Sequence, residues 1–197
     1  MAVHIRDALE EGRRVLQEFV DDNANLEVLG KMARSLAEGF SAGNKVLSCG
    51  NGGSACDAIH FAEELTGRFR GDRPALPAIS LTDAAHLTCV ANDYGFEEVF
   101  ARGVMAYGKP GDTLLAISTS GNSRNVVRAV EAARDREMKV LLLLGKSGGA
   151  LRGKGDSELW IRSQNTERIQ EMHMMALHIL IENVERILFP ANYPALS

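Results

Sequence analysis

Apolar positions in the first forty residues recur at helical spacing. They form two successive groups: Val15, Leu16, Phe19 and Val20, then Leu26, Leu29, Met32, Leu36 and Phe40. Apolar residues three and four apart lie on one side of a helix, so each group predicts an amphipathic helix. The Asp-Asp-Asn run at 21–23 predicts a kink or a cap, and Gly43-Asn44 ends the pattern. We therefore expect a helical N-terminal extension over residues 1–42.

Beyond this extension, short apolar runs alternate with amphipathic stretches. Strands are expected at 45–49, 77–81, 113–118, 139–144 and 158–162. Helices are expected at 54–66, 122–136 and 167–187, and loops at 70–76 and 190–197. The expected strands are apolar throughout, which is typical of parallel strands covered on both faces. The pattern therefore predicts an α/β fold with three α-β-α layers around a five-stranded parallel sheet.

The composition fits a single domain, with 197 residues of which 45% are hydrophobic and 24% charged. The net charge of -4 argues against a nucleic-acid-binding surface, which would be basic. No apolar run approaches the ~20 residues that span a bilayer, and the charged N-terminus lacks the apolar core of a signal peptide. Cys49, Cys56 and Cys89 show no paired spacing, so we expect free, small buried residues in a reducing compartment. These features predict a cytoplasmic protein without membrane or nucleic-acid partners.

Two segments rich in glycine and hydroxyl groups follow expected strands and open expected helices. They are GNGGS at 50–54 and STSGNS at 118–123. Hydroxyls and the N–H groups of a helix start together suit a phosphate, which the helix dipole also favours. An ordinary turn with a Ser or Asn cap is the alternative for either segment alone. Neither segment is a Walker A or G-x-G-x-x-G sequence, so a polyhydroxy phosphate held between the two loops is favoured over a nucleotide.

Polar and ionisable side chains gather in the helix after GNGGS and in the last helix. The candidates are His60, Glu63, Glu64, Gln170, His173 and His178. His60 and Glu64 share one helix face, as Gln170 and His178 do more broadly, whereas His173 lies well off the face of Gln170. Imidazole and carboxylate groups suit Zn²⁺, and they suit a metal-free acid–base pair equally well. For each residue alone, a solvated helix face or a core histidine is the alternative.

Five segments of the chain are distinctive in combination. They are GNGGS (50–54), HFAEELTGRF (60–69), CVANDYGF (89–96), STSGNS (118–123) and RIQEMHMMALHIL (168–180). Together they resemble the phosphoheptose isomerases, which are sedoheptulose-7-phosphate isomerases of the sugar isomerase (SIS) superfamily, over nearly the whole chain. The resemblance implies one SIS domain over residues 1–197, with a five-stranded parallel sheet between helices. It also implies a homotetramer with sites at subunit interfaces, in which residues 1–42 pack on the domain and in the oligomer.

The resemblance also implies roles for individual residues. Glu64 corresponds to the catalytic base and His178 to its acid partner. The implied substrate-binding residues are Asn51, Gly52, Gly53, Glu64, Asn92, Asp93, Ser118, Thr119, Ser120, Ser123 and Gln170, with the phosphate on the four hydroxyl residues. In members with zinc, the ligands correspond to His60, Glu64, Gln170 and His178, which implies one zinc ion per subunit.

The implied reaction converts D-sedoheptulose 7-phosphate to D-glycero-D-manno-heptose 7-phosphate by proton transfer through an enediolate. It is the first step of ADP-heptose and lipopolysaccharide core biosynthesis. A non-catalytic SIS protein that binds the replication initiator DnaA is the alternative, because RIQEMHM and the tail FPANYP resemble such proteins too. Those proteins lack the base and acid at the positions of Glu64 and His178, whose presence here favours the enzyme. A SIS-type sensor that binds a sugar phosphate without turnover is a further alternative.

Overall fold

The computed structural model describes residues 1–193, so the end of the tail predicted at 190–197 lies outside the described residues. The helices are α1 (Ala2–Asp21), α2 (Asn23–Ser41), α3 (Gly53–Thr66), α4 (Ala84–Tyr94), α5 (Val99–Tyr107), α6 (Arg124–Asp135) and α7 (Thr166–Leu188). The strands are β1 (Val46–Gly50), β2 (Ala78–Ser80), β3 (Thr113–Ser118), β4 (Lys139–Gly145) and β5 (Ser157–Ile161). Short 3₁₀ turns are η1 (Phe96–Glu98), η2 (Gly149–Leu151) and η3 (Pro190–Asn192).

All five strands run parallel in the order β2-β1-β3-β4-β5. The neighbours β1 and β3 pair in register from Val46 with Thr113 to Gly50 with Ile117. Their carboxyl ends therefore meet at one edge of the sheet, where the segments GNGGS and STSGNS both begin. The predicted α/β fold with a five-stranded parallel sheet is confirmed.

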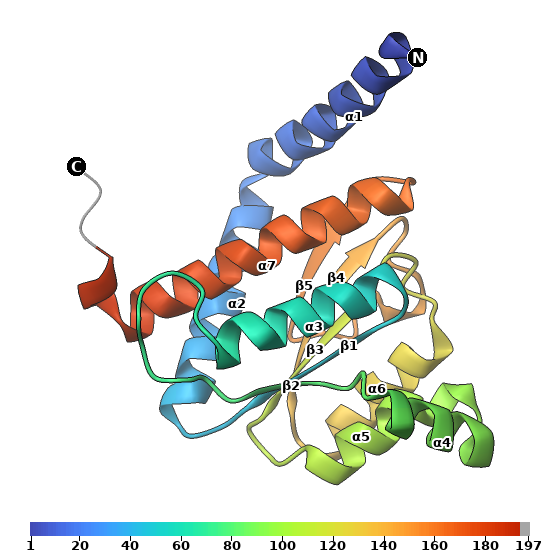
Figure 1. Cartoon of the computed structure of the whole chain (residues 1–197), viewed down its shortest axis with the longest axis vertical. Helices are drawn as coiled ribbons and strands as arrows, with labels where there is room; N and C mark the ends of the chain where they lie inside the picture. Colours follow the sequence, from blue (N-terminus) through green and yellow to red (C-terminus); the bar gives the residue numbers. More distant parts are fainter. Residues whose placement is uncertain (194–197) are drawn as a thin grey trace.

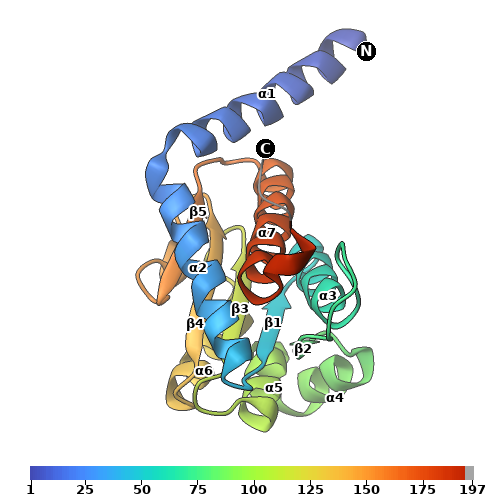
Figure 2. The same cartoon turned by 90° about the vertical axis from the view of Figure 1, so that its left-hand side faces the viewer.

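Helices cover both faces of the sheet (Figures 1 and 2). On one face α2, α3 and α7 share an apolar cluster with Leu115 and Ile117 of β3. On the other face α5 and α6 share a second cluster with Leu114 and Ala116 of the same strand. Alternate residues of a strand point to opposite faces, which is why each strand must be apolar throughout. The predicted three layers are confirmed.

The N-terminal extension consists of two helices that meet in a sharp bend, from which α1 projects away from the sheet (Figures 1 and 2). Asp22 at the bend is extended, and its side chain accepts a hydrogen bond from Ala24 N at 3.1 Å. The kink and cap predicted at 21–23 are thus confirmed. Val3, Ile5 and Leu9 of α1 remain 68%, 58% and 70% exposed.

The apolar pattern does not predict α4 and α5. Only Val90 of α4 is buried, so this helix carries little of the periodicity that would identify it. α6 begins at Arg124 rather than at 122, because the preceding residues form the loop that enters it. The other expected helices and strands differ from the observed ones by a residue or two at their ends.

The cysteines were expected to be free and buried, and the second part of that prediction is wrong for two of them. Cys49, Cys56 and Cys89 are all free, as expected. Cys49 lies inside the sheet, whereas Cys56 on α3 and Cys89 on α4 are exposed on helix faces that point away from it. Within residues 1–193 no helix is both long enough and apolar enough to cross a membrane.

Candidate active site

α3 and α7 lie side by side on one face of the sheet, and three candidate side chains meet between them. His60 Nε2 lies 2.9 Å from His178 Nε2 and 3.4 Å from Glu64 Oε1. The donor atoms of these three residues all lie within 4.8 Å of one another. We call His60, Glu64 and His178 the His-Glu-His cluster. It joins two helices whose histidines are 118 positions apart in the chain.

The His-Glu-His cluster is partly screened from solvent. The Glu64 side chain is 16% exposed and that of His60 is 37% exposed. On the other side of the His60 ring, Nδ1 lies 3.5 Å from a carboxylate oxygen of Glu63. The ring of Phe69 stands 5.7 Å from that of His178 and forms an apolar wall. Each imidazole therefore has neighbours that orient it, and a neutral histidine can donate from one ring nitrogen while accepting at the other.

Asp57 is a buried acid beside the cluster that the sequence analysis did not single out. It lies one turn before His60 on α3, and among the described residues its Oδ2 atom has no hydrogen-bond partner. Burial raises the pKa of the Asp57 carboxyl to about 6, and the nearby His60 offsets part of that effect. The sequence feature that could have identified Asp57 is its place on a helix face that also carries the apolar residues Ala58 and Phe61, which are buried.

A reciprocal amide pair joins the GNGGS loop to the start of α6 at the carboxyl edge of the sheet. Asn51 Nδ2 donates to Asn125 Oδ1 at 2.9 Å, and Asn125 Nδ2 donates back to Asn51 Oδ1 at 2.8 Å. Asn51 belongs to the loop before α3, and Asn125 to the first turn of α6. The two helix starts are therefore held together, as the predicted parallel sheet requires.

The hydroxyls of the STSGNS segment shape the loop before α6. Ser118 Oγ lies 3.2 Å from Ser123 Oγ and accepts a hydrogen bond from Gly121 N at 3.1 Å. Ser120 Oγ accepts a hydrogen bond from Asn122 N, also at 3.1 Å. Ser123 occupies the cap position of α6, yet its side chain makes no capping hydrogen bond. Val126 N donates to Asn125 Oδ1 at 3.0 Å and Val127 N to the carbonyl of Ser123, so the N–H groups of Arg124 and Asn125 are the ones left in the first turn for a bound anion.

Other predicted site residues lie apart from the His-Glu-His cluster. The side-chain amide of Gln170 lies so close to Gly53 that a Cβ there would stand 2.6 Å from its Oε1 atom. This places Gln170 at the GNGGS loop, about 12 Å along α7 from His178. Asn92 and Asp93 are exposed on α4, in the opposite helical layer, and hydrogen-bond to each other at 2.7 Å.

His173 was a candidate ligand, and the structure places it in the core instead. It is fully buried, and its Nε2 atom lies 3.1 Å from the carbonyl oxygen of Leu144, which can only accept. The proton is therefore on Nε2, and the Nδ1 atom is buried without a partner among the described residues. Burial lowers the pKa of His173 to about 4, and the hydrogen bond to Leu144 offsets part of that effect.

Acid conditions are expected to destabilise the protein partly through His173. Its folded-state pKa lies below the ordinary value, so its contribution is complete above about pH 6.5 and is lost as pH falls toward about 4. The full difference is about 3 kcal/mol. His173→Gln, which keeps a donor for Leu144, should lose less free energy of unfolding between pH 7 and pH 4.5 than the wild type. Urea unfolding at both pH values measures this, and equal losses would contradict it.

Comparison with known proteins was made against both sequences and structures. Residues 9–145 match the model of the SIS domain family. A phosphoheptose isomerase of Fusobacterium nucleatum is 55% identical over 179 residues, which are 91% of this chain and 92% of that protein. The structure of a phosphoheptose isomerase from Francisella tularensis is 41% identical, with a TM-score of 0.90 over 94% of this chain and 98% of that one.

A third relative agrees with these two. The phosphoheptose isomerase of Neisseria gonorrhoeae is 38% identical, and its structure matches with a TM-score of 0.86 over 93% of this chain and 98% of that one. Sequence identity at this level over nearly the full length of both chains indicates a common family and not only a common fold. The match to the SIS domain model includes both glycine-rich loops and α3. The chain therefore belongs to the SIS domain family and, within it, to the phosphoheptose isomerases.

Proposed function

We propose that this protein is an isomerase that converts D-sedoheptulose 7-phosphate to D-glycero-D-manno-heptose 7-phosphate. The observation that carries the proposal is the meeting of Glu64 and His178 across α3 and α7, in a chain related over its length to phosphoheptose isomerases. The product would enter ADP-heptose and lipopolysaccharide core biosynthesis. The names of the relatives favour this enzyme over the DnaA-binding alternative.

The reaction moves one proton between carbons and one between oxygens. The C1 hydrogens of the ketose are acidic, because the adjacent carbonyl stabilises the enediolate. Glu64 removes a proton from C1 and returns it to C2, and His178 moves the second proton between the oxygens on these carbons. The position of Glu64 beside two imidazoles supports these roles, since one carboxylate oxygen lies 3.4 Å from His60 Nε2. Each such proton transfer contributes about 10²- to 10⁴-fold to the rate.

The phosphate of the substrate is assigned to the loop before α6. Ser118, Thr119, Ser120 and Ser123 belong to the segment that leads into that helix, whose dipole favours an anion. Asn51, Gly52, Gly53 and Gln170 lie at the neighbouring loop and are assigned to the sugar hydroxyls. Asn92 and Asp93 are assigned to the sugar as well, and their place in the other layer supports a site completed by a second subunit.

The His-Glu-His cluster fits a zinc ion. A tetrahedral site with bonds of about 2.0–2.1 Å separates its ligand atoms by roughly 3.3 Å. The separations of 2.9 Å and 3.4 Å at His60 Nε2 are close to that value. Glu63 beside Nδ1 supplies the outer carboxylate that orients a ligating histidine. Zinc held by His60, Glu64 and His178 would act as a Lewis acid toward the sugar oxygens. Gln170, which the resemblance implies as a fourth ligand, lies at the GNGGS loop apart from these three residues, so it would have to move to join them.

The purified protein is expected to contain about one zinc ion per chain, and the His60→Asn variant to bind zinc at least about tenfold more weakly. His86→Asn is the matched control, because His86 lies outside the cluster with its Nε2 bonded to the carbonyl of Val99 at 3.0 Å. Elemental analysis measures the zinc content of each variant, and chelator titration measures its zinc affinity. Equal zinc content in the two variants would contradict the site, and full activity of a metal-free preparation would exclude an essential metal.

We propose that the enzyme is a homotetramer in which residues 1–42 contribute to the contacts. The exposed apolar side chains of Val3, Ile5 and Leu9 on the projecting α1 support this, because such a row is stabilised by packing on another subunit. The three free cysteines support the cytoplasm as its compartment, since a reducing environment keeps thiols unpaired.

The proposed function is tested by incubating the purified protein with sedoheptulose 7-phosphate and following the heptose product by NMR. Turnover is the expected result. Binding of the sugar phosphate without turnover would instead favour the sensor. A direct complex with purified DnaA, again without turnover, would favour the replication-regulating alternative.

A further inference from the structure

Arg73 is a buried cation in the loop between α3 and β2, and neither the proposed chemistry nor substrate binding uses it. Its side chain is 1% exposed, and that of its partner Glu185 on α7 is fully buried. Arg73 Nε donates to Glu185 Oε1 at 2.7 Å. An ion pair removed from water is costly unless further hydrogen bonds satisfy both groups. The remaining contacts of the guanidinium therefore indicate what it does.

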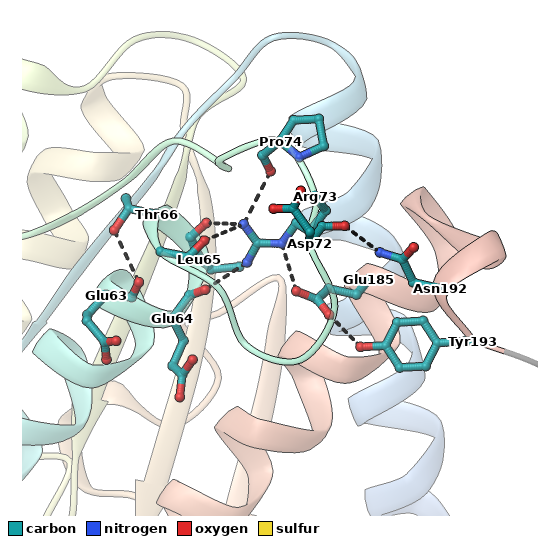
Figure 3. Close-up of polar contacts among 11 residues, drawn as sticks. Glu63, Glu64, Leu65, Thr66, Asp72, Arg73, Pro74, Glu185, Asn192 and Tyr193 are labelled. Carbon is teal, nitrogen blue, oxygen red and sulfur yellow. Dashed lines mark hydrogen bonds and ion pairs between the residues drawn. The ribbon is translucent and has the colours of Figure 1, made fainter.

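Those contacts are main-chain carbonyls, three at the end of α3 and one in the loop next to Arg73 (Figure 3). Arg73 Nη2 donates to the carbonyl of Glu64 at 2.7 Å. Arg73 Nη1 lies 2.8 Å from the carbonyl oxygen of Leu65, 3.1 Å from that of Gly67 and 3.2 Å from that of Pro74. The last carbonyls of a helix have no partner inside the helix, and a cation there is favoured by the dipole. The guanidinium thus binds the backbone of Glu64, whose side chain is the proposed base.

The other end of the same guanidinium is attached to the helix that carries the proposed acid. Glu185 lies two turns beyond His178 on α7, on nearly the same face. The loop after α3 follows α7 in the same direction, with Phe69 beside His178 and Arg70 paired to Glu182 at 2.8 Å. Arg73 therefore links α3 to α7 directly behind the His-Glu-His cluster.

The C-terminal segment completes the connection. Tyr193 OH donates to Glu185 Oε2, the oxygen that Arg73 Nε does not contact. Asn192 Nδ2 donates to the carbonyl of Asp72 at 2.9 Å, next to Arg73 in the chain (Figure 3). Both carboxylate oxygens of Glu185 are thus bonded, which holds its orientation. Residues 189–193 of the FPANYP segment thus have a structural part in the same connection.

We propose that Arg73 is a positioning residue of the isomerase site, which sets the separation of Glu64 and His178 by binding the end of α3 to Glu185 of α7. The inference rests on the proposed function for the expected loss of turnover. The expected change in the separation of Glu64 and His178 does not depend on the proposed function. A misplacement of about 1 Å between reacting groups can cost about a hundredfold in rate, so this connection controls kcat.

The test is the double variant Arg73→Met, Glu185→Leu, which removes both charges and leaves no unpaired buried ion. Its kcat is expected to fall about 10- to 100-fold, with KM changed less than about threefold, because the phosphate loop is elsewhere. Arg73→Lys keeps the charge, but the lysine ammonium cannot reach several carbonyls at once. The kcat of this variant should therefore also stay well below that of the wild type. The double variant Lys45→Met, Asp112→Asn is the matched control, because it removes both charges of another ion pair, at the amino ends of β1 and β3, and keeps an acceptor for the main-chain N–H group of Lys45.

Crystal structures of the wild type and the double variant provide a measurement that does not depend on turnover. The separation of Glu64 Oε1 from His178 Nε2 is expected to change by about 1 Å. An unchanged separation would overturn the inference, as would a double variant with the kcat of an active wild type. A loss of kcat in the control variant Lys45→Met, Asp112→Asn as large as in the Arg73→Met, Glu185→Leu variant would overturn it too. An inactive wild type would instead contradict the proposed function, and the two crystal structures would then decide the role of Arg73.

Discussion

Replacing Glu64 by glutamine is expected to lower kcat for sedoheptulose 7-phosphate by about 10²- to 10⁴-fold. The amide has the size of the carboxylate but cannot take a proton from C1. The side chain is 16% exposed, which limits the access of water as a substitute base. Turnover is measured by NMR of the heptose product. Zinc content is measured on the same samples, because Glu64 is also a proposed ligand.

His178→Gln is expected to give a loss of the same order, since it removes the group that moves the proton between the sugar oxygens. Glu131→Gln provides the control, because this exposed acid lies on α6 over the opposite face of the sheet. Unchanged turnover in both the Glu64 and His178 variants would contradict the mechanism. A loss that zinc addition fully restores would make Glu64 a ligand rather than the base.

Gly121→Ala is expected to lower the free energy of unfolding by more than about 3 kcal/mol and to raise KM by disturbing the phosphate loop. Gly121 has φ of 65°, a conformation that costs other residues about 1–2 kcal/mol. An added methyl group would also overlap the carbonyl oxygen of Gly148. That oxygen belongs to main chain, and Leu151 N donates to Gly121 O at 3.0 Å, so neither segment can move alone.

Gly43→Ala separates the two causes of this loss. Gly43 has φ of 80°, and nothing lies within 4 Å of an added Cβ. This variant should lose only the conformational cost, about 1–2 kcal/mol. Urea unfolding of both variants gives the comparison. Equal losses would mean that the approach of Gly121 to Gly148 does not determine the stability of the loop.

The parts of the fold that were predictable are those with a strong apolar signal. Strands of a sheet covered on both faces must be apolar at every position, and the runs at 113–118 and 139–144 are unmistakable for that reason. α4 was missed because it buries only Val90 and otherwise presents side chains to solvent. A helix that buries so little leaves no periodic pattern to read.

The candidate site was predictable only in part. Helical spacing alone placed His60 and Glu64 on one face of α3, and the structure keeps them there. The same spacing placed His173 off the face that Gln170 and His178 share, but it could not show that His173 lies in the core or that His178 faces α3. Asp57 was missed because an acid in a helix is usually solvated, and its burial depends on the layer packed against it.

The pattern of apolar and polar residues predicted the five strands, the helices other than α4 and α5, the two glycine-rich loops and the candidate residues on each helix, because these are properties of short segments. It did not predict that the Nε2 atoms of His60 and His178, 118 positions apart, lie 2.9 Å from each other. That distance depends on how α3 and α7 pack on one parallel sheet, and on a buried Arg73–Glu185 pair that joins their ends. The burial of a side chain and the meeting of α3 with α7 depend on residues distant in the chain, so no local sequence pattern predicts them.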